Sequence, residues 1–161
     1  MNELYRSTIF LGTEGSHLRQ RNKPKTARLR HADYAALARL RHALRRFSAF
    51  SASAAHAAGL PAQQHQALLA IKGYARGKTM TVGALAEDLL VTPHAATELV
   101  DRLVDAGLIS RTKDADDRRR QKLALTAKAE RILHSLSLVH LKEIRETLPA
   151  LLEILQSLAT A

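Results

Sequence analysis

Apolar residues recur every three or four positions along most of the chain, and this spacing predicts an architecture built mainly of helices. The first sustained pattern spans about 32–58, where Leu37, Leu44 and Phe47 belong to one stripe and Gly59 ends the helix. A helix of about 27 residues is about 40 Å long, which exceeds what a small domain needs. Part of its stripe is therefore expected to face another subunit.

Two capped helices follow a second helix that is expected over 61–74. Thr81 is suited to cap a third helix, and Thr92 followed by Pro93 is a strong start signal for a fourth, which Gly107 ends. The two helices are joined by a turn of about three residues, the spacing of a helix-turn-helix. An ordinary helical pair in a bundle remains the alternative at this point.

Strict alternation of apolar and polar residues then replaces the helical period. Residues 108–113 and 120–125 alternate, and the segment DADDRR at 114–119 separates them, which predicts a β-hairpin with a charged tip. Thr126 is suited to cap a long helix, which Pro149 is expected to end before a last leucine-rich helix. The predicted fold class is mainly α with a small β-hairpin: a winged helix-turn-helix with long N- and C-terminal dimerisation helices.

The fourth helix and the hairpin hold the candidate DNA contacts. The major groove of B-DNA admits one α-helix, and small residues near its start let the backbone approach the base edges. Asp117 lies two residues before Arg119, so the carboxylate is expected to hold the guanidinium on the same side of the strand. The candidate contacts are Thr92, His94, Ala95, Thr97, Glu98 and Arg102 on the helix, and Lys113, Asp117, Arg118, Arg119 and Arg120 on the hairpin.

Charge favours a polyanionic partner. The chain has 25 Lys and Arg against 15 Asp and Glu, a net charge of +10. Residues 1–31 carry seven basic and two acidic side chains, so +5 of the total lies in a basic N-terminal tail ahead of a domain at 32–161. This N-terminal tail is either mobile or in contact with DNA phosphates or a partner subunit.

Composition excludes several function classes. The chain has no cysteine, which excludes disulfides, thiol catalysis and cysteine-ligated zinc. It has no apolar run of transmembrane length and no recognisable secretion signal, so a cytoplasmic protein without a membrane partner is expected. The eight histidines show no metal-ligand or catalytic spacing. We therefore expect no metal, no cofactor and no enzymatic activity.

The run LVDRLVDAGLISR, followed by DADDRR and LALT, closely resembles the MarR family of bacterial transcriptional regulators. The resemblance implies a winged helix-turn-helix at about 60–126, a recognition helix at 92–106, a wing at 114–119, and terminal helices at about 32–58 and 127–160 that interlock in a homodimer. Asp117 and Arg119 match the family's wing motif, whose Arg enters the minor groove. His94, Ala95 and Glu98 depart from the residues common in the family, so the base contacts do not carry over.

The resemblance further implies a repressor that leaves a pseudo-palindromic operator when a small aromatic or phenolic ligand binds. His42 and His65 lie near the region where the family builds its effector pocket, and with Arg46 and Leu69 they are the candidate ligand-binding residues. Ordinary helical packing alone also explains the two histidines, and it is the simpler interpretation. Two other functions stay open: an architectural or RNA-binding module without an effector, and a histidine-dependent enzyme.

Overall fold

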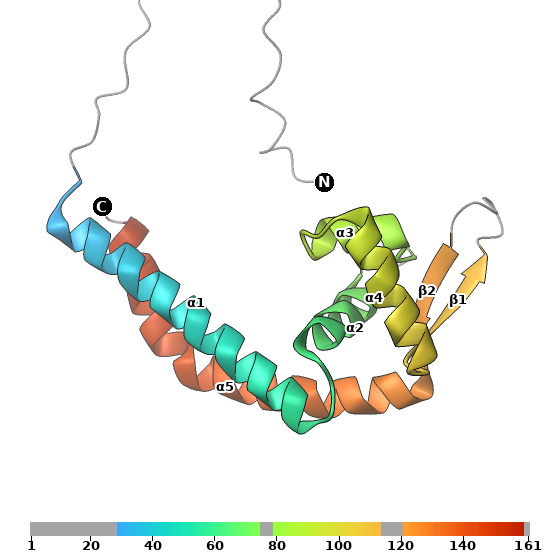
Figure 1. Cartoon of the computed structure of the whole chain (residues 1–161). Helices are drawn as coiled ribbons and strands as arrows, with labels where there is room; N and C mark the ends of the chain where they lie inside the picture. Colours follow the sequence, from blue (N-terminus) through green and yellow to red (C-terminus); the bar gives the residue numbers. More distant parts are fainter. Residues whose placement is uncertain (1–28, 75–78, 114–120, 160–161) are drawn as a thin grey trace, which may run out of the picture.

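The computed structural model describes residues 29–74, 79–113 and 121–159. Within these residues the chain forms five helices and one antiparallel pair of strands (Figure 1). In chain order the elements are α1 (His31–Ala57), α2 (Ala62–Gly73), α3 (Val82–Asp88), α4 (Pro93–Asp105), β1 (Ile109–Lys113), β2 (Gln121–Leu125) and α5 (Ala127–Ala159). The predicted fold class is confirmed.

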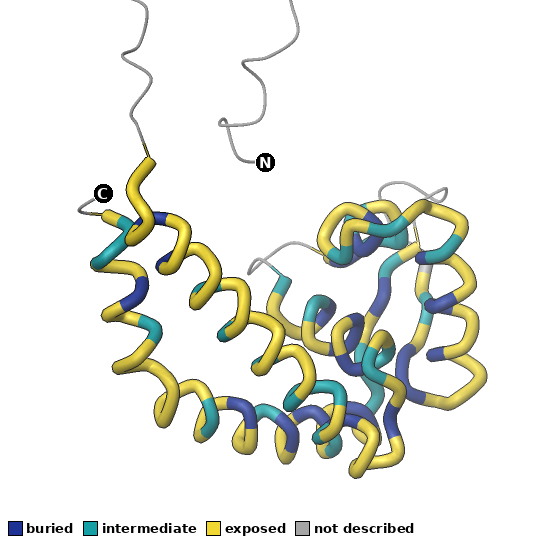
Figure 2. Tube along the Cα trace, turned by 60° about the vertical axis from the view of Figure 1, so that its left-hand side comes forward, coloured by how far each residue is buried: buried dark blue, intermediate teal, exposed yellow. Residues whose placement is uncertain are grey.

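The elements are arranged as a lobe with a two-helix arm. Helix α1 lies antiparallel to the C-terminal part of α5, and these two helices extend away from the lobe that α2, α3, α4 and the hairpin form (Figure 1). The N-terminal part of α5 continues into the lobe. Figure 2 shows that buried positions concentrate in the lobe, whereas the arm is mostly exposed. The long terminal helices are therefore only partly covered within one chain.

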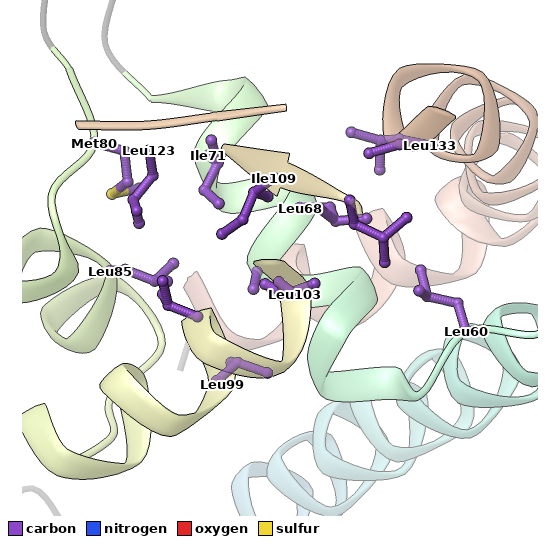
Figure 3. Packing of buried hydrophobic residues seen from close by; sticks show 14 of the residues in the cluster. Leu60, Leu68, Ile71, Met80, Leu85, Leu99, Leu103, Ile109, Leu123 and Leu133 are labelled. Atoms are coloured by element: carbon purple, nitrogen blue, oxygen red, sulfur yellow. The ribbon is translucent and has the colours of Figure 1, made fainter. Parts of the chain in front are cut away.

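The lobe has one hydrophobic core to which every element except α1 contributes a buried residue. Leucines from α2, α3, α4, β2 and α5 point toward a common centre (Figure 3). Fully buried side chains of this size each contribute about 1.5–3 kcal/mol, so the core holds the short helices in place. The larger buried members are Leu60, Leu68, Ile71, Met80, Leu85, Leu99, Val100, Leu103, Leu108, Ile109, Leu123, Leu133 and Leu136.

Threonine caps begin three of the helices, as the sequence predicts. The hydroxyl of Thr81 accepts from the Ala84 N–H at 3.2 Å, and that of Thr92 accepts from the Ala95 N–H at 3.2 Å. Thr126 caps α5 in the same way, with the Ala129 N–H at 3.3 Å. Each cap satisfies a backbone donor that the helix leaves unpaired.

The hairpin pairs Ile109 with Leu125 and continues in register to the pair Lys113 and Gln121. A single bridge joins Thr81 to Lys122, and the Leu123 N–H donates to the Met80 carbonyl at 2.9 Å. This bridge lies directly ahead of α3. It attaches the start of the helix-turn-helix to the wing.

The end of the last helix differs from the sequence prediction. Pro149 does not end the last helix: α5 runs through it to Ala159, and Ile154 beyond it is buried again. A proline removes only local hydrogen bonds, so tertiary burial on its far side keeps the helix going. On α4, Val104 is partly exposed, and on α2 Leu69 is half exposed because the buried face follows His65, Ala67, Leu68 and Ile71.

Leu90 has a left-handed backbone, with φ of 55°, and its side chain is 92 % exposed. It directly follows the last residues of α3, where the Val91 N–H donates to the Ala86 carbonyl at 3.0 Å. This is the position at which helices usually place glycine. A leucine there carries backbone strain without any burial to offset it.

We expect Leu90→Gly to stabilise the fold. Relief of the left-handed strain, about 1–2 kcal/mol, outweighs the extra unfolded-state entropy of glycine, about 0.5–1 kcal/mol. Thermal unfolding at fixed protein concentration should show a midpoint about 2 °C above wild type. Leu90→Ala is the matched control because it removes the same side chain and keeps the strain. An equal rise in both variants would assign the effect to the lost apolar surface instead.

Candidate nucleic-acid interface and ligand cavity

Helices α3 and α4 pack on each other and expose one face of α4. Ala96, Leu99, Val100 and Leu103 are buried against the lobe core, at the spacing of one helical face. The apolar face therefore fixes the rotation of α4 about its axis. The polar face on the other side is left to solvent, at a helix N-terminus whose partial positive charge favours anions.

The exposed face of α4 begins with His94, whose side chain is 86 % exposed. Its Nε2 lies 3.3 Å from Oε1 of Glu98, one turn further along. The Thr97 hydroxyl donates to the Pro93 carbonyl at 2.9 Å, which leaves its oxygen free to accept. Thr92 and Arg102 are exposed on the same helix, and Ala95 is half buried. The structure thus brings the six helix candidates onto one short segment.

An ion pair joins α4 to the wing. The guanidinium of Arg111 on β1 contacts the Asp101 carboxylate on α4, and the Arg111 side chain is largely covered. Neither residue is among the candidates that the sequence singled out. Residues ten apart on a helix and a strand show no local pattern, so only packing reveals this pair. It holds the base of the wing against the candidate recognition helix.

The wing candidates fall mostly beyond the described residues. Lys113 ends β1, while Asp117, Arg118, Arg119 and Arg120 lie outside the described part of the chain. Their roles remain predictions from the sequence.

Three contacts tie the lobe to the start of α5. Lys128 donates to the Ala106 carbonyl at 3.0 Å, and the Thr126 hydroxyl donates to the Gly107 carbonyl at 2.9 Å. On the other side of the lobe, Lys72 on α2 pairs with Glu130 at 2.6 Å. The end of α4 and the end of α2 are thereby both attached to α5, so movement of α5 carries the lobe with it.

A cavity of about 460 Å³ lies where α1, α2 and α5 meet. That volume falls in the range of small-molecule sites. Of the four sequence candidates, His65 and Leu69 line it, whereas His42 and Arg46 are exposed on α1 and do not. The lining residues are Phe47, Ser48, Ser51, His65, Gln66, Leu69, Ser137, His140, Leu141 and Ile144.

Two histidine rings stack at the wall of this cavity. The rings of His65 on α2 and His140 on α5 have centroids 4.8 Å apart and are tilted by 31°. His140 Nε2 lies 2.8 Å from the Ser51 hydroxyl on α1, and its Nδ1 lies 2.6 Å from the Leu136 carbonyl. The stack therefore joins all three helices. The sequence named His140 only as one of eight histidines, because residues 75 apart reveal no contact.

His65 is unusual among these groups. It is 3 % exposed, and its Nδ1 is buried without a hydrogen-bond partner. Burial, and secondarily the charge of His140, lowers the pKa of His65 below its ordinary value. The neutral imidazole is therefore the favoured form in the folded protein.

Other kinds of site find no support in the described residues. Within 29–74, 79–113 and 121–159, no three His, Cys, Asp or Glu side chains gather where they could hold a metal ion. No helix in these ranges is long and apolar enough to cross a membrane.

The comparisons with known proteins agree with this geometry. Residues 58–120 match the model of the MarR family, a range that includes α2, α3, α4 and β1. No curated protein matches the sequence.

Several solved structures share the fold. MepR, a transcription regulator of the Staphylococcus aureus multidrug efflux pump MepA, is 20 % identical with a TM-score of 0.61, over 73 % of this chain and 82 % of MepR. Apo MarR from E. coli is 24 % identical with a TM-score of 0.60, over 70 % of this chain and 81 % of MarR. A complex of S. aureus MepR with DNA matches with 19 % identity and a TM-score of 0.53, over 71 % and 81 % of the two chains.

The family match spans the helix-turn-helix and the start of the wing, and the family's fold extends over most of the described chain. Residues 58–120 thus match the MarR family, and the described chain has the winged helix-turn-helix fold of the solved MarR and MepR structures.

Proposed function

We propose that the protein binds a pseudo-palindromic operator as a homodimer and leaves it when a small ligand enters the cavity between α1, α2 and α5. The observation that carries the proposal is the orientation of α4. Its apolar face is buried in the lobe, its N-terminus is capped, and a polar face containing His94, Thr97 and Glu98 is left to solvent. Such a face fits the major groove. The DNA complex of the similarly folded MepR supports this use of the fold.

The arm supplies the surface for dimerisation. Large apolar side chains remain exposed along both of its helices, and monomeric proteins rarely leave so many together. On α1 these are Tyr34, Leu37 and Leu44, and on α5 they are Leu138, Val139, Leu141, Ile144, Leu148, Leu152 and Leu155. A two-fold dimer joined through the arms would present two copies of α4. Their operator half-sites would be about 34–36 Å apart.

The cavity is the site through which a ligand controls operator binding. It lies between the arm and α2, the first helix of the lobe, so a ligand there contacts both parts. A ligand that binds better when lobe and arm adopt another angle shifts the separation of the two α4 helices. Operator affinity then falls by the difference in ligand affinity between the two arrangements.

Homodimerisation is testable by light scattering at micromolar concentration. We expect about twice the chain mass of 17.7 kDa. Leu44→Glu and Leu155→Glu place a charge on the exposed apolar face of each arm helix and should give monomers that bind operator poorly. Leu90→Glu is the control, because it makes the same change at an exposed leucine outside the arm. A wild-type monomer that binds operator would contradict this proposal.

The reading of bases is testable by selection of binding sites from random DNA. His94→Ala should change the preferred bases at particular positions, with a loss of about 1–3 kcal/mol on the wild-type site. Arg102→Ala, if the side chain contacts phosphate, should instead weaken all sites alike and reduce the salt dependence. Identical preferences for wild type and His94→Ala would show that His94 reads no base. Binding without any sequence preference would favour an architectural module.

The wing contact is testable at Arg119, which lies outside the described residues. Arg119→Ala should weaken operator binding by about 1–3 kcal/mol at fixed salt, because it removes the expected minor-groove contact. Circular dichroism and light scattering should be unchanged. Wild-type affinity in this variant would remove the wing tip from the binding surface.

A further inference from the structure

We infer that the cavity between α1, α2 and α5 binds a small organic monoanion together with one proton, which is held on His65. This coupling deepens the ligand-controlled release proposed above and rests on it. It makes the protein release DNA more readily in acid, and it assigns the stacked pair of His65 and His140 as the group that senses the proton.

The cavity offers hydrogen-bond donors but no fixed charge. Among the residues that the structure describes, its lining contains no Asp, Glu, Lys or Arg, and the two histidines are the only ionisable side chains there. Around them stand three serine hydroxyls, the Gln66 amide, and an apolar wall that includes Phe47. Of these, the Ser48 and Ser137 hydroxyls and the Gln66 amide can donate to an anion, and no carboxylate of the described lining repels one. The net charge of +10 further attracts anions to the molecule.

A bound anion needs a positive charge beside it, and the charged residues described on the surrounding helices do not line the cavity. On α1 the nearest in sequence to the lining, Arg45 and Arg46, are exposed. On α5, Glu143 and Arg145 lie outside the lining, and on α2 Lys72 is paired with Glu130. An unpaired anion in a largely apolar cavity is costly, so the anion needs a proton on one of the two imidazoles.

His140 already has partners for both ring nitrogens. The Leu136 carbonyl can only accept, so the proton of neutral His140 lies on Nδ1. Nε2 then accepts from the Ser51 hydroxyl, and the same hydroxyl can accept if His140 becomes charged. Two aromatic rings meet His140 edge to face, Phe47 at 6.1 Å and Phe50 at 5.7 Å. Its orientation is therefore determined in either protonation state.

His65 is the group that a ligand changes most. Its buried Nδ1 is unsatisfied, and without a ligand its charged form is disfavoured by burial and by His140. An anion against the ring reverses this balance, since it stabilises the imidazolium. The proton comes from solvent. Since His65 belongs to the lobe and His140 and Ser51 to the arm, the new charge acts where lobe and arm meet.

Acid favours ligand binding in this scheme, but it should lower the folding stability of the unliganded protein. Because the folded state lowers the pKa of His65, the unfolded chain binds more protons as pH falls below the ordinary value of 6.5. The stability that neutral His65 contributes is thus present above pH 6.5 and lost below it. Loss of stability in acid should be smaller in His65→Gln than in wild type, whereas His134→Gln, an exposed histidine on α5, should follow wild type.

Titration calorimetry on the full-length protein without DNA tests the coupling directly. The probes are benzoate and hexanoate, with benzamide and hexanamide as uncharged counterparts of the same shape. At pH 7, runs in two buffers of different ionisation enthalpy give the number of protons taken up. We expect about one proton per bound carboxylate and none per amide. His65→Gln should abolish proton uptake and weaken carboxylate binding about tenfold or more, while His134→Gln keeps both.

The outcomes separate this inference from the proposed function. Carboxylate binding without proton uptake overturns it, as does equal uptake in His65→Gln or no carboxylate binding at millimolar concentration. The comparison of carboxylate with amide uses wild type alone, so it decides whether anion binding takes up a proton even if His65→Gln fails to fold. Fluorescence anisotropy with the selected operator then tests release, which should need less benzoate at pH 6 than at pH 8. Proton-coupled binding with no effect on operator affinity would leave the site standing and overturn ligand-controlled release.

Discussion

The burial of one face of α5 in two different places is the constraint on which the rest of the molecule depends. Near its start, Ala129, Leu133 and Leu136 belong to the lobe core, and further along His140 and Ile154 are buried where α5 accompanies α1. A helix is stiff over several turns, so a single continuous α5 transmits position between the two parts. Both the placement of the recognition helix and the site of the cavity follow from this shared element.

The lobe is held together by helix caps, buried leucines and one ion pair between α4 and the wing. Threonine caps begin α3, α4 and α5, and the burial of Leu99 and Leu103 sets the rotation of α4. The ion pair between Arg111 and Asp101 then links that helix to the wing. The lobe is therefore held together as one unit, and α5 joins it to the arm.

The cavity lies at the boundary between the lobe and the arm, and its two histidines differ in their hydrogen bonding. His140 is fully hydrogen-bonded and serves as a fixed wall, whereas His65 is buried with an unsatisfied nitrogen. Unsatisfied buried polar atoms are uncommon in folded proteins because each costs free energy. Such an atom beside a cavity of ligand size is the feature that separates this pocket from ordinary imperfect packing.

The sequence by itself determined the helix-turn-helix, its caps and the hairpin, because these depend on neighbours in the chain. Thr92 with Pro93 and the two-residue alternation of the strands are short-range signals that the structure confirms. The family resemblance placed His65 near the family's effector pocket, and in the structure His65 lines the cavity between α1, α2 and α5. Only the tertiary structure decided that α5 continues through Pro149, that His42 and Arg46 stay outside the cavity, and that His140 and Ser51 complete it. Contacts between residues 75 or more positions apart depend on how helices cross, and side-chain patterns within one helix do not encode that crossing.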